Sequence, residues 1–308
     1  MIKWLGIRGA VLPRWRNVKI KSKKESFDSP VVSIAAESAV TSGKPMPHRL
    51  ALGAVFAVAV LFIGLFLYVS LSRIRYPFDL EWLEGSMVVN VQRVLAGKGL
   101  YVEPSQEFAC YQQQPVYYWV SALFSLPLGA GYFPLRLVSV LSAIGTLVLL
   151  FLIVRRETKS AVYGVVAAGV YAAGYGCMSE WYDIARVDSL CVFWLTAGLY
   201  AVRRPKPAAW NSALAAVLFL LAVFTKHPAV FVFAGAAAYL TLVNWRQGAV
   251  MAGIFTVGAG AAVLCMDRAT GGWYTFYTFK LLQDISGLKS NFLGFWQHSM
   301  LLVVPVWC

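Results

Sequence analysis

The chain is built mainly from apolar segments long enough, or nearly long enough, to cross a membrane. The first covers residues 50–74, and six more follow at 132–154, 161–178, 188–202, 208–224, 228–243 and 248–266. A membrane-crossing helix needs about 20 residues, and several of these segments are a little shorter. Of the 308 residues, 59% are hydrophobic and only 13% are charged, which is too apolar for a soluble globular protein. We therefore predict an all-α protein, a polytopic transmembrane helix bundle.

The positions of the cations predict how the bundle is oriented. Residues 115–128 form a further apolar run, but it is short, flanked by prolines and rich in Tyr and Trp, so we predict that it lies at the membrane interface. If it does not cross, the cation clusters at 155–159 and 203–206 lie on the same side as the basic N-terminus, as the positive-inside rule requires. If it did cross, both double-arginine clusters would be exported. The pattern thus predicts seven spans with the N-terminus inside.

Two units follow from this topology. Residues 1–49 are basic, are interrupted by Pro and Ser, and lack the apolar core of a signal peptide, so they are predicted to form a disordered cytoplasmic tail. Residues 50–308 form the predicted transmembrane domain. An eighth apolar run starts near His298 and stops at Cys308, too early to cross, which predicts an incomplete C-terminal end.

Several other classes of protein and site are disfavoured. The net charge of +13 could suggest a nucleic-acid partner, but the cations lie in short clusters at the ends of apolar runs, where membrane orientation explains them better. The five cysteines form no CxxC or His-paired pattern and are interpreted as small apolar residues. No metal-ligand spacing and no phosphate-binding glycine loop are present, so neither a metal nor a cofactor is predicted.

Acidic residues are scarce, yet "PFDLEWLEG" places Asp79, Glu81 and Glu84 just after the first span, on the exported side. Apolar residues recur at helical spacing over 80–95, with Glu81 and Glu84 on another face. Asp79 is then placed as the N-cap of this helix, and "LAGKGLY" ends it. Capping and complementation of the helix dipole could explain all three acids without any catalytic role.

Two more exported corners carry charges. "SEWYDIARVDSL" brings Asp183, Arg186 and Asp188 to the outer end of a span, where an ionisable group is costly and usually has a partner or a function. "FTKHPAV" places Lys226 and His227 between two spans. The plain explanations are local ion pairs, a snorkelling lysine and a satisfied interfacial imidazole. The alternative is a cationic site for the phosphate of a lipid carrier.

The order of these motifs resembles that of a known family. The acidic motif, "RVLAGKGLYVEP", "QQPVYYW", "PLRLVSVLSAIGTLVLLFLIVRRE", "ARVDSL" and "FTKHPA" are similar to the bacterial membrane glycosyltransferases of the GT-C superfamily, such as lipid A aminoarabinose transferases and protein O-mannosyltransferases. The similarity covers roughly residues 77–230. It implies a GT-C fold with interfacial helices in the first exported loop. It also implies a sugar taken from a polyprenyl-phosphate carrier at the outer face, passed to a lipid, glycan or protein acceptor.

The resemblance also implies roles for individual residues. The family commonly has Asp-Glu-Gly where this chain has Leu83-Glu84-Gly85, so Glu84 matches the acidic base best, with Glu81 and Asp79 able to reach the same space. Asp188 matches the second exported acid, as an orienting or second catalytic group. The predicted substrate-binding residues are Lys226 and Arg186 on the phosphate, with His227, Asp183 and Tyr117 nearby.

The prediction is therefore an inverting glycosyltransferase, transferring a hexosyl or pentosyl group, in a bacterial inner membrane with its active site on the periplasmic side. A flippase or transporter of polyprenyl-linked sugars is one alternative, but it predicts charges at the bilayer midplane and inverted repeats, and the sequence has neither. A non-catalytic or truncated subunit is the other alternative.

Overall fold

A computed structural model describes residues 46–203, 209–281 and residue 294, and every regular element within them is a helix. The prediction of an all-α fold is thus confirmed for the described part of the chain. Two compact units are distinguished, Met1–Arg49 and Leu50–Cys308. The predicted disordered tail lies outside the described residues as far as residue 45, and so does the apolar run that begins near residue 298.

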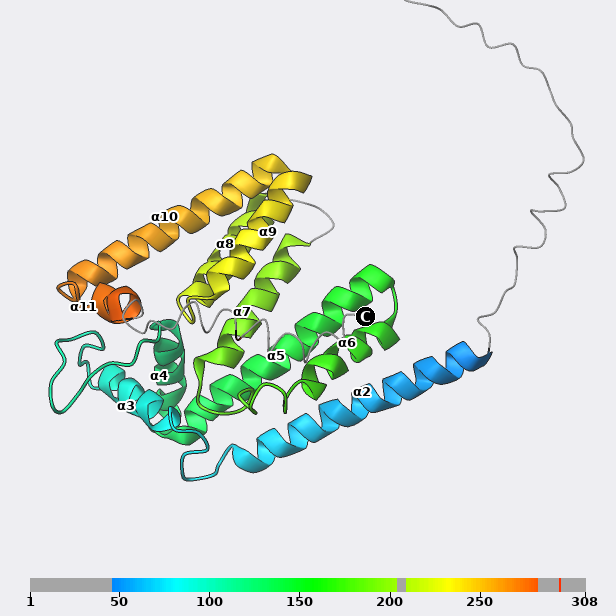
Figure 1. Cartoon of the computed structure of the whole chain (residues 1–308), viewed down its shortest axis with the longest axis horizontal. Coiled ribbons are helices and arrows are strands. Elements are labelled where there is room, and N and C mark those ends of the chain that lie inside the picture. The colour runs from blue at the N-terminus through cyan, green and yellow to red at the C-terminus, as the bar shows by residue number, and fades with distance from the viewer. Residues whose placement is uncertain (1–45, 204–208, 282–293, 295–308) are drawn as a thin grey trace, which may run out of the picture. The chain divides into compact units, whose positions relative to one another are not determined.

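Three helices in the described ranges are long and apolar enough to cross a membrane: α2 (Met46–Arg73), α5 (Tyr132–Thr158) and α10 (Trp245–Ala269) (Figure 1). They correspond to the predicted spans 50–74, 132–154 and 248–266. Five further apolar helices are shorter: α4 (Val116–Leu128), α6 (Ala161–Ala173), α7 (Val187–Val202), α8 (Ala209–Val223) and α9 (Ala229–Val243). The crossing of the membrane by α6 to α9 stays a prediction.

Two of the short helices test the predictions. The length of α4 bears on the predicted topology, and the end of α6 differs from its predicted limit. The helix α4 has 13 residues, which at about 1.5 Å per residue is well short of the roughly 30 Å hydrocarbon core, in keeping with an interfacial position. The helix α6 ends at Ala173 and not at residue 178, because residues 174–182 form consecutive turns. In these turns Ser179 and Glu180 have φ of 53° and 60°, a left-handed conformation that stops an α-helix.

Packing in the Leu50–Cys308 unit is organised around α5 and α7. The helix α5 packs against α4, α6 and α7, whereas α7 packs against α8, which in turn packs against α10. Close approach uses glycine: a Cβ added at Gly164 of α6 would lie 2.7 Å from the Phe151 ring of α5, and one at Gly169 would lie 2.3 Å from Ala59 of α2. These positions therefore need glycine for helix contact.

The exported loop contains α3 (Glu84–Leu95), which begins four residues later than predicted. Its N-cap is Leu83, without a side-chain cap, so the prediction of Asp79 as N-cap is wrong. The physical reason is a turn before the helix, in which Glu84 accepts from Leu80 N at 2.7 Å and Glu81 accepts from Leu83 N at 2.9 Å. The predicted end is confirmed: Gly97 (φ 65°) closes α3 with hydrogen bonds from Gly97 N to Val94 O and from Lys98 N to Arg93 O.

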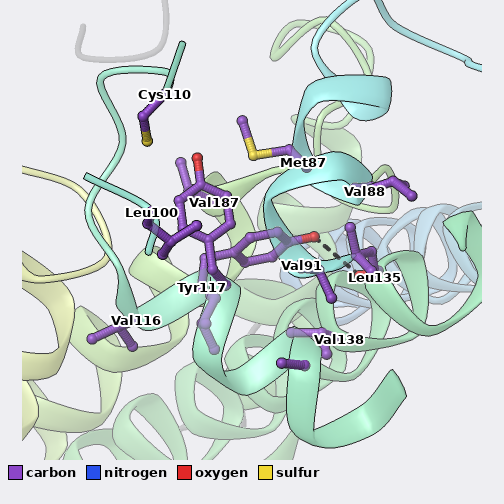
Figure 2. Packing of buried hydrophobic residues seen from close by; sticks show 14 of the residues in the cluster. Met87, Val88, Val91, Leu100, Cys110, Val116, Tyr117, Leu135, Val138 and Val187 are labelled. Atoms are coloured by element: carbon purple, nitrogen blue, oxygen red, sulfur yellow. Dashed lines mark hydrogen bonds between the residues drawn. The ribbon is translucent and has the colours of Figure 1, made fainter. Parts of the chain in front are cut away.

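A hydrophobic cluster joins α3 and α4 to the outer ends of α5 and α7 (Figure 2). Tyr117 of α4 lies in its middle, fully buried, and its hydroxyl donates to Leu135 O of α5 at 3.1 Å. Burial raises the pKa of this phenol, so it stays neutral. With no exposed surface, Tyr117 is placed to hold α4 against α5. A substrate contact of Tyr117, as predicted from the sequence, stays a prediction.

Candidate active site

Glu84 lies at the start of α3 in a fully buried ion pair with Arg136 of α5. Arg136 donates to Glu84 from Nε at 2.9 Å and from Nη2 at 2.6 Å. The same carboxylate accepts from Leu80 N at 2.7 Å and from Ala185 N at 2.6 Å. Both side chains are 0% exposed. The Glu84 carboxylate therefore has four donors and no contact with solvent.

These donors decide the protonation state of Glu84. Burial alone would raise the pKa of the carboxyl, but the hydrogen bonds from Arg136, Ala185 and Leu80 outweigh it and hold the pKa below its ordinary value. A general base needs access to the acceptor and a pKa near the working pH. Glu84 has neither property, so its geometry favours a structural role over the role of base that the resemblance implied.

Arg136 was not singled out in the sequence. Besides Glu84 it binds Tyr76 O at 2.5 Å and Phe78 O at 2.7 Å, so one guanidinium holds the chain between α2 and α3. The sequence did contain a signal for this role. Arg136 lies in the first two turns of a long apolar helix, where an unpaired charge would be costly. Together, Glu84 and Arg136 join the first exported loop, the outer end of α5 and the corner that precedes α7.

A second group of charges lies beside this pair and is partly exposed. Glu81 Oε1 pairs with Arg186 Nη1 at 2.9 Å, Arg186 Nε pairs with Asp188 Oδ2 at 3.0 Å, and Asp188 Oδ1 pairs with Lys226 Nζ at 2.5 Å. We call Glu81, Arg186, Asp188 and Lys226 the charge chain. It alternates in sign and draws on three segments that are predicted to be exported. Four residues predicted for the site are thus brought into one continuous cluster.

Within the charge chain the exposed fraction of the side chain is smallest at Arg186 and largest at Lys226. The Arg186 side chain is 9% exposed and stacks its guanidinium 3.9 Å from the centre of the Trp181 ring, whereas Glu81 is 16% and Lys226 is 32% exposed. The Arg186 guanidinium is therefore held rigidly by an aromatic face and two carboxylates. The Lys226 ammonium retains open directions in which an anion could bind.

His227 lies next to Lys226 but takes part in a different network. Its Nε2 is hydrogen-bonded to the side-chain amide of Gln114, whose Oε1 accepts from Tyr274 Oη at 2.8 Å. Burial lowers the pKa of His227, which favours the neutral imidazole. Gln114 and Tyr274 were not predicted, because they lie 113 and 47 positions away from His227 in the sequence and only folding brings them together.

An apolar cavity of about 510 Å³ opens beside this network. Gln114, His227 and Tyr274 form its polar edge, and the remaining walls come from α8 to α10, from the α8–α9 corner and from the π-helical turn Phe276–Lys280 that follows the short helix α11 (Trp273–Thr275). Phe231 and Phe279, which are exposed, belong to this wall. The cavity thus has a polar edge at His227, next to Lys226 in the sequence, and an apolar body.

Two further predicted acids, Asp183 and Asp79, also lie outside the charge chain. Asp183 is buried, accepts from Tyr175 Oη at 2.9 Å and pairs with Arg73 Nε at 3.5 Å, so it ties the corner to the end of α2. Burial raises the pKa of Asp183 above its ordinary value, although Arg73 acts against this. Asp79 is exposed and lies within hydrogen-bonding reach of Tyr132. Neither residue contacts the cations of the charge chain.

Comparison with known proteins identifies the family. A family model described as dolichyl-phosphate-mannose-protein mannosyltransferase matches residues 112–267, just over half of the 308-residue chain. The chain belongs to this family. Its GT-C character confirms the resemblance inferred from the motifs and, with the long apolar helices, makes the chain an integral membrane glycosyltransferase. No curated protein and no solved structure matches the chain.

The matched part of this family member contains Arg186, Asp188, Lys226 and His227, but not the acids of residues 79–84. The family match therefore covers the cationic half of the candidate site. Among the described residues, no group of three or more His, Cys, Asp or Glu side chains is arranged to hold a metal ion.

Proposed function

We propose that this chain transfers a sugar from a polyprenyl-phosphate carrier to an acceptor hydroxyl, with inversion at the anomeric carbon. The observation that carries the proposal is the charge chain, which brings two carboxylates and two cations together, with Lys226 one residue from His227 at the edge of an apolar cavity. Family membership supports the reaction class. The reaction needs no more than these parts: a base, positive charge for the leaving phosphate, and room for an isoprenoid chain.

Lys226 and Arg186 are the proposed binding groups for the carrier phosphate. Lys226 has the most exposed charge of the four, and Arg186 presents a planar guanidinium held in place by Trp181. As the bond between the anomeric carbon and the phosphate oxygen breaks, that oxygen keeps the electron pair and its negative charge grows. Preorganised cations stabilise such a charge more in the transition state than in the ground state. Asp188, held between both cations, orients them.

Glu81 is the proposed base. The acceptor oxygen attacks the anomeric carbon from the face opposite the phosphate, and its proton passes to the carboxylate. Glu81 is partly exposed and pairs with a single cation, whereas Glu84 is enclosed by four donors and Asp188 is held by two cations. Glu81 is therefore the acid of these three that can both reach an acceptor and take up a proton, and, unlike the exposed Asp79, it lies next to the cations proposed to bind the phosphate. Glu84 then acts as a positioning residue: it binds Ala185 N, next to Arg186, and so sets the distance between Arg186 and Glu81.

The cavity of about 510 Å³ is the proposed place for the first isoprene units of the carrier. Its body is apolar, and its polar edge at His227 is one residue from Lys226, so a chain lying in it would bring its phosphate to the charge chain. By the orientation that the cations predict, this end of the bundle faces the outside, which in a bacterium is the periplasmic side of the inner membrane.

The test is a transfer assay with purified protein in detergent, radiolabelled polyprenyl-phosphate sugars and candidate acceptors. General base catalysis is typically worth about 10²–10⁴-fold, and we expect Glu81→Gln to lose transfer by a factor in this range while the protein stays folded. Glu103→Gln, an exposed acid in the same loop, is the matched control and should transfer at the wild-type rate. Full transfer by Glu81→Gln together with loss in Asp79→Asn would overturn the assignment of the base.

The same purified protein, reconstituted in vesicles, distinguishes the glycosyltransferase proposal from the flippase alternative. If the carrier moves between leaflets and no sugar is released for any acceptor, the glycosyltransferase proposal is wrong. Sugar release that depends on both Glu81 and Lys226 supports the proposal.

A further inference from the structure

A basic cavity lies at the end of α5 that is opposite to the candidate active site. Arg136, at the active-site end, and Arg155 are 19 positions apart on this one helix. At about 1.5 Å per residue this separation is close to the roughly 30 Å of a hydrocarbon core. The cavity therefore lies at the headgroup level of the other leaflet, which the orientation of the cations predicts to be the inner one.

Three cations line this cavity of about 410 Å³: Arg155, Arg156 and Lys159, with Leu152 and Tyr200 completing the wall. No carboxylate belongs to the lining. The nearby Glu157 pairs with Arg203 at 3.1 Å, outside the cavity. Among the residues that the structure describes, no acid comes within ion-pair distance of the three cations. Their charges are thus gathered around a hollow and are compensated only in part, by Glu157, whose own charge is stabilised mainly by Arg203 and further by Arg156 and Lys159.

The arginines are held in place on aromatic rings. The Arg156 guanidinium lies 5.7 Å from the centre of the Tyr200 ring of α7, and the Arg155 guanidinium lies 5.7 Å from that of Phe151. Lys159 ends α5 in a left-handed conformation (φ 57°) that glycine usually occupies, and so brings its side chain back to the helix end. Cations at a helix C-terminus complement the helix dipole, which explains why these residues are positively charged. It does not explain why they surround a cavity whose lining contains no acid.

We propose that this cavity binds the phosphate of an anionic membrane lipid in the leaflet opposite the active site. Arginine matches phosphate geometry through parallel N–H donors, and lysine adds a point charge. The wall is partly apolar at Leu152, and a lipid headgroup is already concentrated at this level of the membrane. This assignment does not depend on the transfer reaction or on its catalytic residues.

The test measures lipid binding to the full chain by native mass spectrometry, with phosphatidylglycerol compared with phosphatidylcholine. We expect the wild type to prefer phosphatidylglycerol, and Arg156→Gln to weaken phosphatidylglycerol binding about tenfold, since a hydrogen bond to a charged group is of that order. Arg156→Lys should keep part of the preference. The matched control is Arg246→Gln: this exposed arginine also lies 5.7 Å from an aromatic ring, that of Trp245, but outside the cavity, so its lipid preference should not change.

Two outcomes would overturn the proposal. One is an unchanged preference for phosphatidylglycerol in Arg156→Gln, provided that the variant elutes as a folded monodisperse species. The other is Arg156-dependent binding of inorganic phosphate that displaces the lipid, which would assign the cavity to a soluble anion. Failure here leaves the proposed transferase activity intact, because the assay contains no carrier or acceptor.

Discussion

Two clusters of ion-paired residues lie at the same end of the bundle, and they differ in solvent access. The Glu84–Arg136 pair is 0% exposed and saturated with hydrogen bonds, whereas Lys226, in the charge chain, is 32% exposed. Glu81 and Glu84 are only three positions apart, yet one is partly open and the other enclosed. The difference teaches that two carboxylates of one short segment can have opposite environments, one enclosed by donors and the other open enough for the chemistry proposed above.

Breaking the buried pair should have the largest effect on stability. We expect Arg136→Met to destabilise the folded protein by about 3–5 kcal/mol, because Glu84 is left as an uncompensated buried charge. Thermal unfolding in detergent measures this loss. Arg75→Met is the control, since Arg75 is exposed over the Phe133 ring and should cost little. An equally small change in both variants would remove the structural role given to the pair.

The pH dependence sharpens the same contrast. The folded pKa of Glu84 lies below its ordinary value of 4.5, so the pair stabilises the protein above pH 4.5, and that stabilisation is lost as the pH falls through the lowered folded value. In Arg136→Met the partner is absent. We therefore expect the difference in melting temperature between wild type and Arg136→Met to be largest near neutral pH and to shrink in acid. A difference that stays constant from pH 7 to about pH 3 would contradict this account.

Removing Lys226, the most exposed residue of the charge chain, should reduce the rate of sugar transfer and leave the stability of the fold nearly unchanged. Loss of one preorganised group that stabilises a developing charge typically costs about 10²–10³ in rate, and we expect Lys226→Ala to fall in this range, with little change in melting temperature. Lys98→Ala, an exposed lysine just after α3, is the matched control for transfer. If Lys226→Ala unfolded as readily as Arg136→Met, the two clusters would not differ in the way described.

The smallest expected effect concerns the polar edge of the apolar cavity. Tyr274→Phe keeps the ring but removes the hydroxyl that donates to Gln114 Oε1, so a buried amide oxygen loses this donor. The cost is expected to be about 1–2 kcal/mol in unfolding free energy. Tyr68→Phe, on an exposed tyrosine of α2, should leave stability unchanged. A cost near zero at Tyr274 would mean that the Gln114–His227 network is satisfied without it.

Much of the fold could be predicted because the signals are local. The apolar runs identify the long helices α2, α5 and α10, and the paired glycines after residue 96 mark the end of α3. The start of α3 could not be predicted in the same way. Asp79 has the chemistry of a cap, but Glu81 and Glu84 bind the turn before the helix instead, and this depends on contacts with Arg136 and Ala185.

The candidate site was predictable as a set of residues but not as an arrangement. Arg186, Asp188 and Lys226 were recognised as charges at outer span ends, and they do lie together. Asp183 has the same local signal, and Tyr117 was added from the resemblance, but both side chains are buried outside the charge chain. Burial depends on which helix faces cover which, and spacing along the chain does not report that.

The sequence by itself determined that this protein is an α-helical membrane protein, because hydropathy is a property of each segment. Only the tertiary structure decided which acid is enclosed and which is open. Glu84 meets Arg136 across 52 positions and Ala185 across 101, and those contacts leave Glu81 to pair with Arg186 at the edge of the site. Side-chain roles here depend on distances between segments, and those distances are set only when α3, α5 and the corner before α7 pack together.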